Sequence, residues 1–153
     1  EGWEPKWRTR KNPDSMFFAT VLNGVISDSQ WKWIQADLEA SHARGQECVA
    51  YMHIPLEYLQ GGRKIGAPPF TAPGPDPDTF ASTLTKNGCE YIFVGHNHYN
   101  QDEQFGELKE RLTIGVGANT PKANGKKGFR VIHIKDGKVT GTETYEIGYE
   151  DLK

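Results

Sequence analysis

The stretch EYIFVGHNHYN, residues 90–100, joins an apolar run to two histidines that lie one residue apart. The run YIFV shows no alternation of polar and apolar residues, which is typical of a strand covered on both faces of an α/β sheet. In an extended backbone, residues i and i+2 lie on the same side, so we expect His96 and His98 to face one point. The stretch therefore predicts a buried strand that leads into a polar site.

A similar stretch precedes it in the chain. ECVAYMHIPL, residues 47–56, is also apolar with little alternation, and His53 follows its strand-like part. A third apolar run, MFFATVL at residues 16–22, is predicted to form another strand. Residues 27–45 lie between MFFATVL and ECVAYMHIPL, and they begin with Ser27 and Gln30 in the pattern of a capping box. Their apolar residues form one helical stripe, which consists of Trp31, Ile34 and Leu38.

A shorter helix is predicted at residues 78–88, with Asp78 or Thr79 as its cap and Gly88 as its end. The chain thus alternates strands with helices, which implies an α/β fold of parallel strands joined by right-handed crossovers. Ligands of such sheets gather at the carboxyl ends of the strands. We therefore expect His53 and His96 to lie near each other.

Two segments follow other patterns. Residues 61–78, GGRKIGAPPFTAPGPDPD, contain five prolines and four glycines, so neither helix nor sheet is expected there. Such a long segment is either a lid over a site or disordered. After residue 105, β-rich runs and the turn pair Asp136-Gly137 predict an antiparallel meander.

The length of 153 residues suits one domain, predicted at residues 16–153 after an extended leader at residues 1–15. The net charge of −2 gives no reason to expect nucleic acid or an anionic membrane as a partner. No apolar run approaches the roughly 20 residues of a membrane-spanning helix. Cys48 and Cys89 are too few for a disulfide framework and are interpreted as buried thiols.

Three histidines are candidate metal ligands, namely His53, His96 and His98. Two separate strand ends carry them, and imidazole is a good ligand for several transition metals. The alternative is that they are ordinary surface or core residues, which is our interpretation of His42 and His133. Nucleotide-binding glycine patterns and nucleophile elbows are absent from the sequence, so no catalytic nucleophile or organic cofactor site is predicted.

Four motifs carry a resemblance to a known family. They are SQWKWIQADL (29–38), MHIPL (52–56), FVGHNHYN (93–100) and KGFRVIHI (127–134). Together they resemble the C-terminal half of a calcineurin-like metallophosphoesterase, the superfamily that includes the purple acid phosphatases. The resemblance covers residues 16 to about 147. It implies a dinuclear site of Fe, Mn or Zn and the hydrolysis of phosphoesters, with His53 and His96 on one metal and His98 on the other.

The other ligand motifs of the family, D-x-H, G-D-x-x-D and G-N-H-[DE], do not occur in this sequence. Carboxylates are needed to offset the charge of two metals about 3.5–4 Å apart. We therefore expect the chain to be part of a phosphoester hydrolase whose N-terminal half supplies the rest of the site, and to hold one metal or none by itself. In that protein, Arg63 and Lys64 are candidate phosphate contacts or solvated charges. The second hypothesis is a non-catalytic binding or scaffold module with the same half-fold.

Overall fold

A computed structural model describes residues 26–61, 74–115 and 126–148. The elements in these ranges are α2 (Asp28–Ala43), β1 (Cys48–Tyr51), the 3-10 helix η2 (Leu56–Gly61), α3 (Pro77–Lys86), β2 (Cys89–Val94), β3 (Gln101–Phe105), β4 (Leu108–Leu112), β5 (Lys127–Lys135) and β6 (Lys138–Ile147). Several predictions lie outside the described residues. They are the leader at 1–15, the strand at 16–22, and most of the loop at 61–78, including Arg63 and Lys64.

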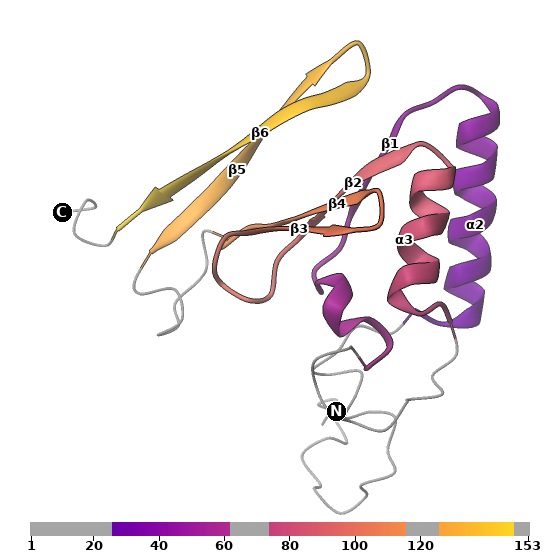
Figure 1. Cartoon of the computed structure of the whole chain (residues 1–153), viewed down its shortest axis with the longest axis horizontal. Helices are drawn as coiled ribbons and strands as arrows, with labels where there is room; N and C mark the ends of the chain where they lie inside the picture. The colour runs from indigo at the N-terminus through magenta and orange to yellow at the C-terminus, as the bar shows by residue number, and fades with distance from the viewer. Residues whose placement is uncertain (1–25, 62–73, 116–125, 149–153) are drawn as a thin grey trace, which may run out of the picture.

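The central sheet has the strand order β1-β2-β4-β3 (Figure 1). β1 is parallel to β2, with α3 in the connection between them, and β2 is parallel to β4. β3 is antiparallel to β4 and lies at the edge of the sheet. The predicted α/β class, with parallel strands and an antiparallel C-terminal part, is confirmed. β3 was missed because its sequence, QDEQF, is polar, which an edge strand with one neighbour tolerates.

Both helices cover the same face of the sheet (Figure 1). The predicted capping box of α2 is confirmed, because the Ser27 hydroxyl accepts a hydrogen bond from the Gln30 N–H and the Gln30 side chain accepts one from the Ser27 N–H. The predicted stripe also faces the core. Leu38 is buried, and Trp31 and Ile34 pack against the core cluster.

The predicted start of α3 is wrong by two to three residues. The cap is Asp76, whose carboxylate accepts hydrogen bonds from the N–H groups of Asp78 at 2.9 Å and Thr79 at 3.0 Å. Pro77 is the first helical residue, and it fits there because the first N–H of a helix has no partner within the helix. The proline content of residues 61–78 predicts a loop that includes Pro77, although proline is unfavourable only further inside a helix.

The core lies between the helices and the sheet. Its fully buried members include Leu56, Leu59, Ile92 and Leu108. The opposite face of the sheet carries stacked rings, with centroids 5.3 Å apart for Tyr51–Phe93 and 6.1 Å apart for Tyr91–Phe93. Tyr51 is 65% exposed, so this face is only partly covered.

β5 and β6 form a separate antiparallel hairpin, which lies on the side of the sheet away from the helices (Figure 1). Its turn is at Asp136 and Gly137, which both have positive φ, as the sequence predicted. Arg130 joins the hairpin to the central sheet, because its guanidinium donates to Asp102 at 2.7 Å and to the Leu112 carbonyl at 3.1 Å.

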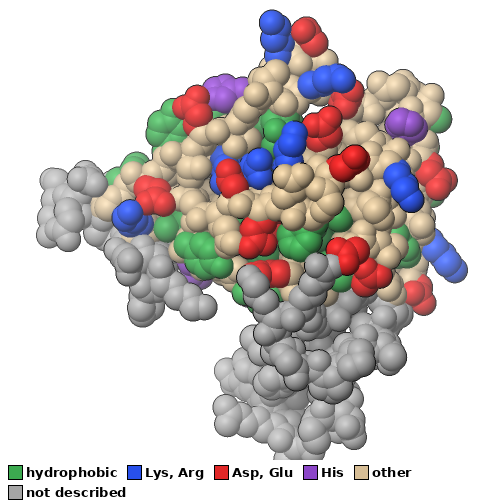
Figure 2. Space-filling view, in the orientation of Figure 1, with side chains coloured by type: hydrophobic (Ala, Val, Ile, Leu, Met, Phe, Trp, Pro, Cys, Tyr) green, Lys and Arg blue, Asp and Glu red, His purple; other side chains and the backbone are tan. Residues whose placement is uncertain are grey.

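Positive and negative side chains are interspersed on the face seen in Figure 2, in agreement with the small net charge. Of the helices in the described ranges, none is both long and apolar enough to cross a membrane.

Candidate metal centre

His53 and His96 meet at the carboxyl edge of the sheet. Because β1 and β2 are adjacent and parallel, the residues that follow them are neighbours, and the Gly95 N–H donates a hydrogen bond to the His53 carbonyl at 3.0 Å. The Nδ1 atom of His96 lies 3.3 Å from the Nε2 atom of His53. The two rings are nearly perpendicular, at 86°. His53 is exposed and His96 is half-buried, so an ion from solvent can reach the pair.

The distance between the two nitrogens suits a shared cation as well as a shared proton. Two imidazole nitrogens that each lie about 2.0–2.1 Å from a tetrahedral Zn²⁺ are about 3.3–3.4 Å apart. The observed separation is 3.3 Å. With one ring as donor and the other as acceptor, the same spacing is a hydrogen bond. The spacing of the pair therefore suits either a proton or a metal ion, although a metal ion would require each ring to turn so that its lone pair points away from the line between the two nitrogens.

His98 does not follow the expected geometry. β2 ends at Val94, and both His96 and His98 have positive φ, at 75° and 55°. The expectation that the two residues share one side of an extended strand is therefore wrong. The cause is a tight turn, closed by a hydrogen bond of 2.9 Å from the Asn97 N–H to the Gly95 carbonyl. Within the described ranges, no three His, Cys, Asp or Glu side chains are grouped so that they could hold a metal.

Two buried carboxylates contact the segments that follow the two histidines, and sequence reasoning missed both. Glu57 is 5% exposed and accepts a hydrogen bond of 3.4 Å from the Asn97 side chain. Glu110 is 3% exposed and accepts a hydrogen bond of 2.8 Å from the Leu56 N–H. The available signal was the position of Glu57, which follows the His53 strand end by four residues inside an apolar segment.

Tyr58 borders the same region. Its ring lies edge-on to His96, with centroids 6.0 Å apart. Burial raises the pKa of Tyr58 above its usual value, and the hydrogen bond with Glu57 raises the pKa further, against a smaller opposing effect of Asn97. Tyr58 therefore stays a neutral hydrogen-bond donor at physiological pH.

The remaining histidines lie elsewhere. His42 is in the last turn of α2, and His133 on the hairpin contacts Glu143 at 2.8 Å between Nε2 and Oε1. Neither lies in a group of three possible ligands among the described residues. Their interpretation as ordinary residues is compatible with these positions.

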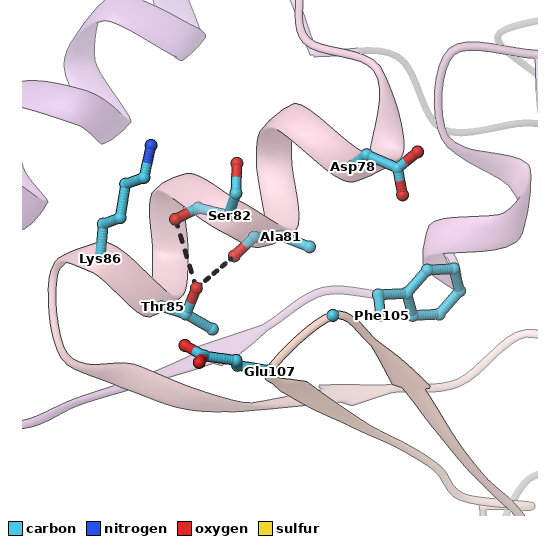
Figure 3. Close-up of a pocket in the computed structure, with 8 residues that line it drawn as sticks. Asp78, Ala81, Ser82, Thr85, Lys86, Phe105 and Glu107 are labelled. Atoms are coloured by element: carbon cyan, nitrogen blue, oxygen red, sulfur yellow. Dashed lines mark hydrogen bonds between the residues drawn. The ribbon is translucent and has the colours of Figure 1, made fainter.

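A hollow on the surface lies apart from the histidines. It is formed by α3 and the turn between β3 and β4, and Figure 3 shows Ser82, Lys86, Phe105 and Glu107 around it. Thr85 donates its hydroxyl to the carbonyls of Ala81 and Ser82 at 3.3 Å, so its polar group is used within the helix. The hollow is open, and we assign no chemistry to it.

Comparison with known proteins adds no assignment. No protein-family model matches the chain, and none of the curated proteins matches it. The geometry of His53 and His96 and the sequence motifs are therefore the basis for assigning a function.

Proposed function

We propose that the chain is the C-terminal portion of a metal-dependent phosphoester hydrolase. In this proposal His53 and His96 bind one transition metal, and His98 binds a second. The observation that supports it most is the separation of 3.3 Å between His96 Nδ1 and His53 Nε2. The pair lies where ligands of α/β sheets bind, beyond the carboxyl ends of parallel strands. Fe, Mn and Zn all accept imidazole ligands.

A pair of such metals supplies an activated water and a positive clamp for phosphoryl oxygens. The role of His53 and His96 is to present the two facing nitrogens without protons. A proton on either of these nitrogens competes with the metal for the lone pair.

The rest of the site must come from other residues. Among the described residues no carboxylate is grouped with the two histidines to form a three-ligand set. A charge-balanced dinuclear site needs carboxylates, which we assign to the N-terminal half of the same domain. By itself, the 153-residue chain is therefore expected to hold at most one metal and to hydrolyse phosphoesters negligibly.

The test compares the 153-residue chain with the natural full-length protein and its His96→Ala variant. Each is assayed on p-nitrophenyl phosphate and bis-p-nitrophenyl phosphate with added Mn²⁺, Zn²⁺ or Fe²⁺. We expect metal-dependent turnover only in the full-length protein, and its loss in His96→Ala. Full activity of His96→Ala would refute the assignment of this ligand. An inactive full-length protein that still binds metal would support the binding or scaffold module instead.

A further inference from the structure

His96 has a strained backbone. The hydrogen bond from the Asn97 N–H to the Gly95 carbonyl, 2.9 Å long, spans only three residues, and the φ of the central residue His96 is +75°. A γ-turn with positive φ at its centre is rare and strained. For a non-glycine residue such a conformation costs on the order of 1–3 kcal/mol and persists only where the surroundings enforce it. Something must therefore hold the turn that carries His96.

The buried contact next to this turn is made by the Asn97 side chain. Asn97 is 8% exposed, and its amide Nδ2 donates to Glu57 Oε1 at 3.4 Å and to the Tyr99 hydroxyl at 3.3 Å. Glu57 belongs to η2, which begins three residues after His53. The contact therefore joins η2, which follows His53, to Asn97, which follows His96.

The backbone contact between the two strand ends lies one residue before His96. The Gly95 N–H bonds to the His53 carbonyl, which fixes Gly95 beside His53. The direction of the His96 ring depends on the backbone torsions of His96 itself, and the positive φ of His96 is the strained one. Asn97 follows His96 directly, and of the three turn residues Gly95, His96 and Asn97 it alone is buried.

We propose that Asn97 and Glu57 are positioning residues, whose hydrogen bond keeps the strained turn closed and so holds His96 Nδ1 against His53 Nε2. The effect on metal affinity rests on the proposed function. The effect on the orientation of the two rings can be tested without metal. A group that orients a metal ligand typically changes metal affinity by about 10- to 100-fold when it is removed.

The pair allows an exchange of donor and acceptor. In Asn97→Asp, two buried carboxylates face each other and the amide that donates to Glu57 is lost, so the turn is expected to open. In the double variant Asn97→Asp/Glu57→Gln, the glutamine amide can donate to the new aspartate, and the hydrogen bond is restored with opposite polarity. In Glu57→Gln alone, the glutamine oxygen can still accept from Asn97.

A matched control is Asn87→Asp, which loses a side-chain hydrogen bond to the Thr83 carbonyl at the end of α3.

The first measurement is the ¹⁵N spectrum of the histidine rings in the metal-free chain. We expect His53 and His96 to show the fixed tautomers of a hydrogen-bonded pair in the native protein, in Glu57→Gln, in Asn87→Asp and in the double variant. In Asn97→Asp, both rings should show the mixed tautomers of free histidine. Unchanged rings in Asn97→Asp, or no recovery in the double variant, would overturn the inference. Thermal unfolding of the same proteins separates this effect from a general loss of stability, because Asn87→Asp should lose stability without any change in the rings.

The second measurement is titration with Co²⁺, followed by its visible absorption. Asn97→Asp should bind Co²⁺ about tenfold or more weakly than the native chain, although the added carboxylate by itself would favour a cation. The double variant should recover to within a few-fold. Equal affinity of the native chain and Asn97→Asp would overturn the positioning role, whereas equal affinity of the native chain and His53→Ala would overturn the proposed function.

Discussion

The carboxylate of Glu110 in β4 accepts a hydrogen bond from the backbone N–H of Leu56, at 2.8 Å. This bond connects β4, an inner strand of the sheet, to the first residue of η2, which begins three residues after His53. Both groups are buried, since Glu110 is 3% exposed and Leu56 is 0% exposed. A side chain in the core thus fixes the path of the segment that carries Glu57.

Replacing Glu110 by alanine should lower the free energy of unfolding by about 1–3 kcal/mol, because it leaves the buried Leu56 N–H without its acceptor. Glu110→Gln keeps an acceptor and should cost less. Urea denaturation of both variants measures the difference. Glu90→Ala is the control, because Glu90 lies on the surface in an ion pair with Lys109, and such pairs contribute only about 0–1 kcal/mol. A Glu110→Ala protein as stable as Glu90→Ala would contradict the assigned role of the Leu56 bond.

Arg130 should control the attachment of the hairpin. Its side chain is 5% exposed, and it bonds Asp102, the Leu112 carbonyl and the Thr142 hydroxyl. Arg130→Ala should therefore destabilise the fold by about 1–3 kcal/mol. Amide hydrogen exchange should speed up in β5 and β6 more than in β2. Lys126→Ala, which removes a half-exposed contact to Glu146, should leave exchange nearly unchanged. Equal acceleration of amide exchange in β2 and in the hairpin would mean that Arg130 has no local role.

The pH dependence of stability should include a contribution from Cys89. Burial, with a smaller effect of nearby Cys48, raises the pKa of Cys89 from 9.0 to about 11. The folded state therefore favours the neutral thiol. The contribution of the buried Cys89 thiol to the free energy of unfolding is complete below pH 9, where the unfolded thiol is also neutral. This contribution is lost as the pH rises toward about 11. The stability advantage of the native protein over Cys89→Ala should shrink by up to about 2–3 kcal/mol over this range. Parallel stability curves for the two proteins would show that Cys89 does not titrate in this way.

The parts of the fold that sequence could predict are those with strong local signals. The capping box at Ser27, the stripe that includes Leu38 and the Asp136-Gly137 turn each depend on neighbouring residues, and each is present. β3 has no such signal, because its pairing with β4 holds a polar edge strand in place. The start of α3 was shifted because Pro77 is favourable at the first helical position and unfavourable further inside.

The candidate site was predictable only in part. The strand pattern and the parallel order of β1 and β2 are enough to bring His53 next to His96. The turn at His96 was not predictable, because a positive φ is uncommon at any non-glycine residue and persists only where tertiary contacts enforce it. The same reason explains why Glu57 was missed, since its contact to Asn97 joins residues 40 positions apart.

The central claim is that His53 and His96 bind one metal through two particular nitrogens, and titration of the ¹⁵N-histidine-labelled chain with Zn²⁺ tests it most directly. We predict binding of one Zn²⁺ that shifts the His53 Nε2 and His96 Nδ1 resonances and leaves those of His42 and His133 unchanged. The variants His53→Ala and His96→Ala should each abolish the shift in the remaining partner, whereas the control His133→Ala should not. Unperturbed His53 and His96 rings at saturating Zn²⁺, or equal binding by the native chain and His96→Ala, would contradict the account.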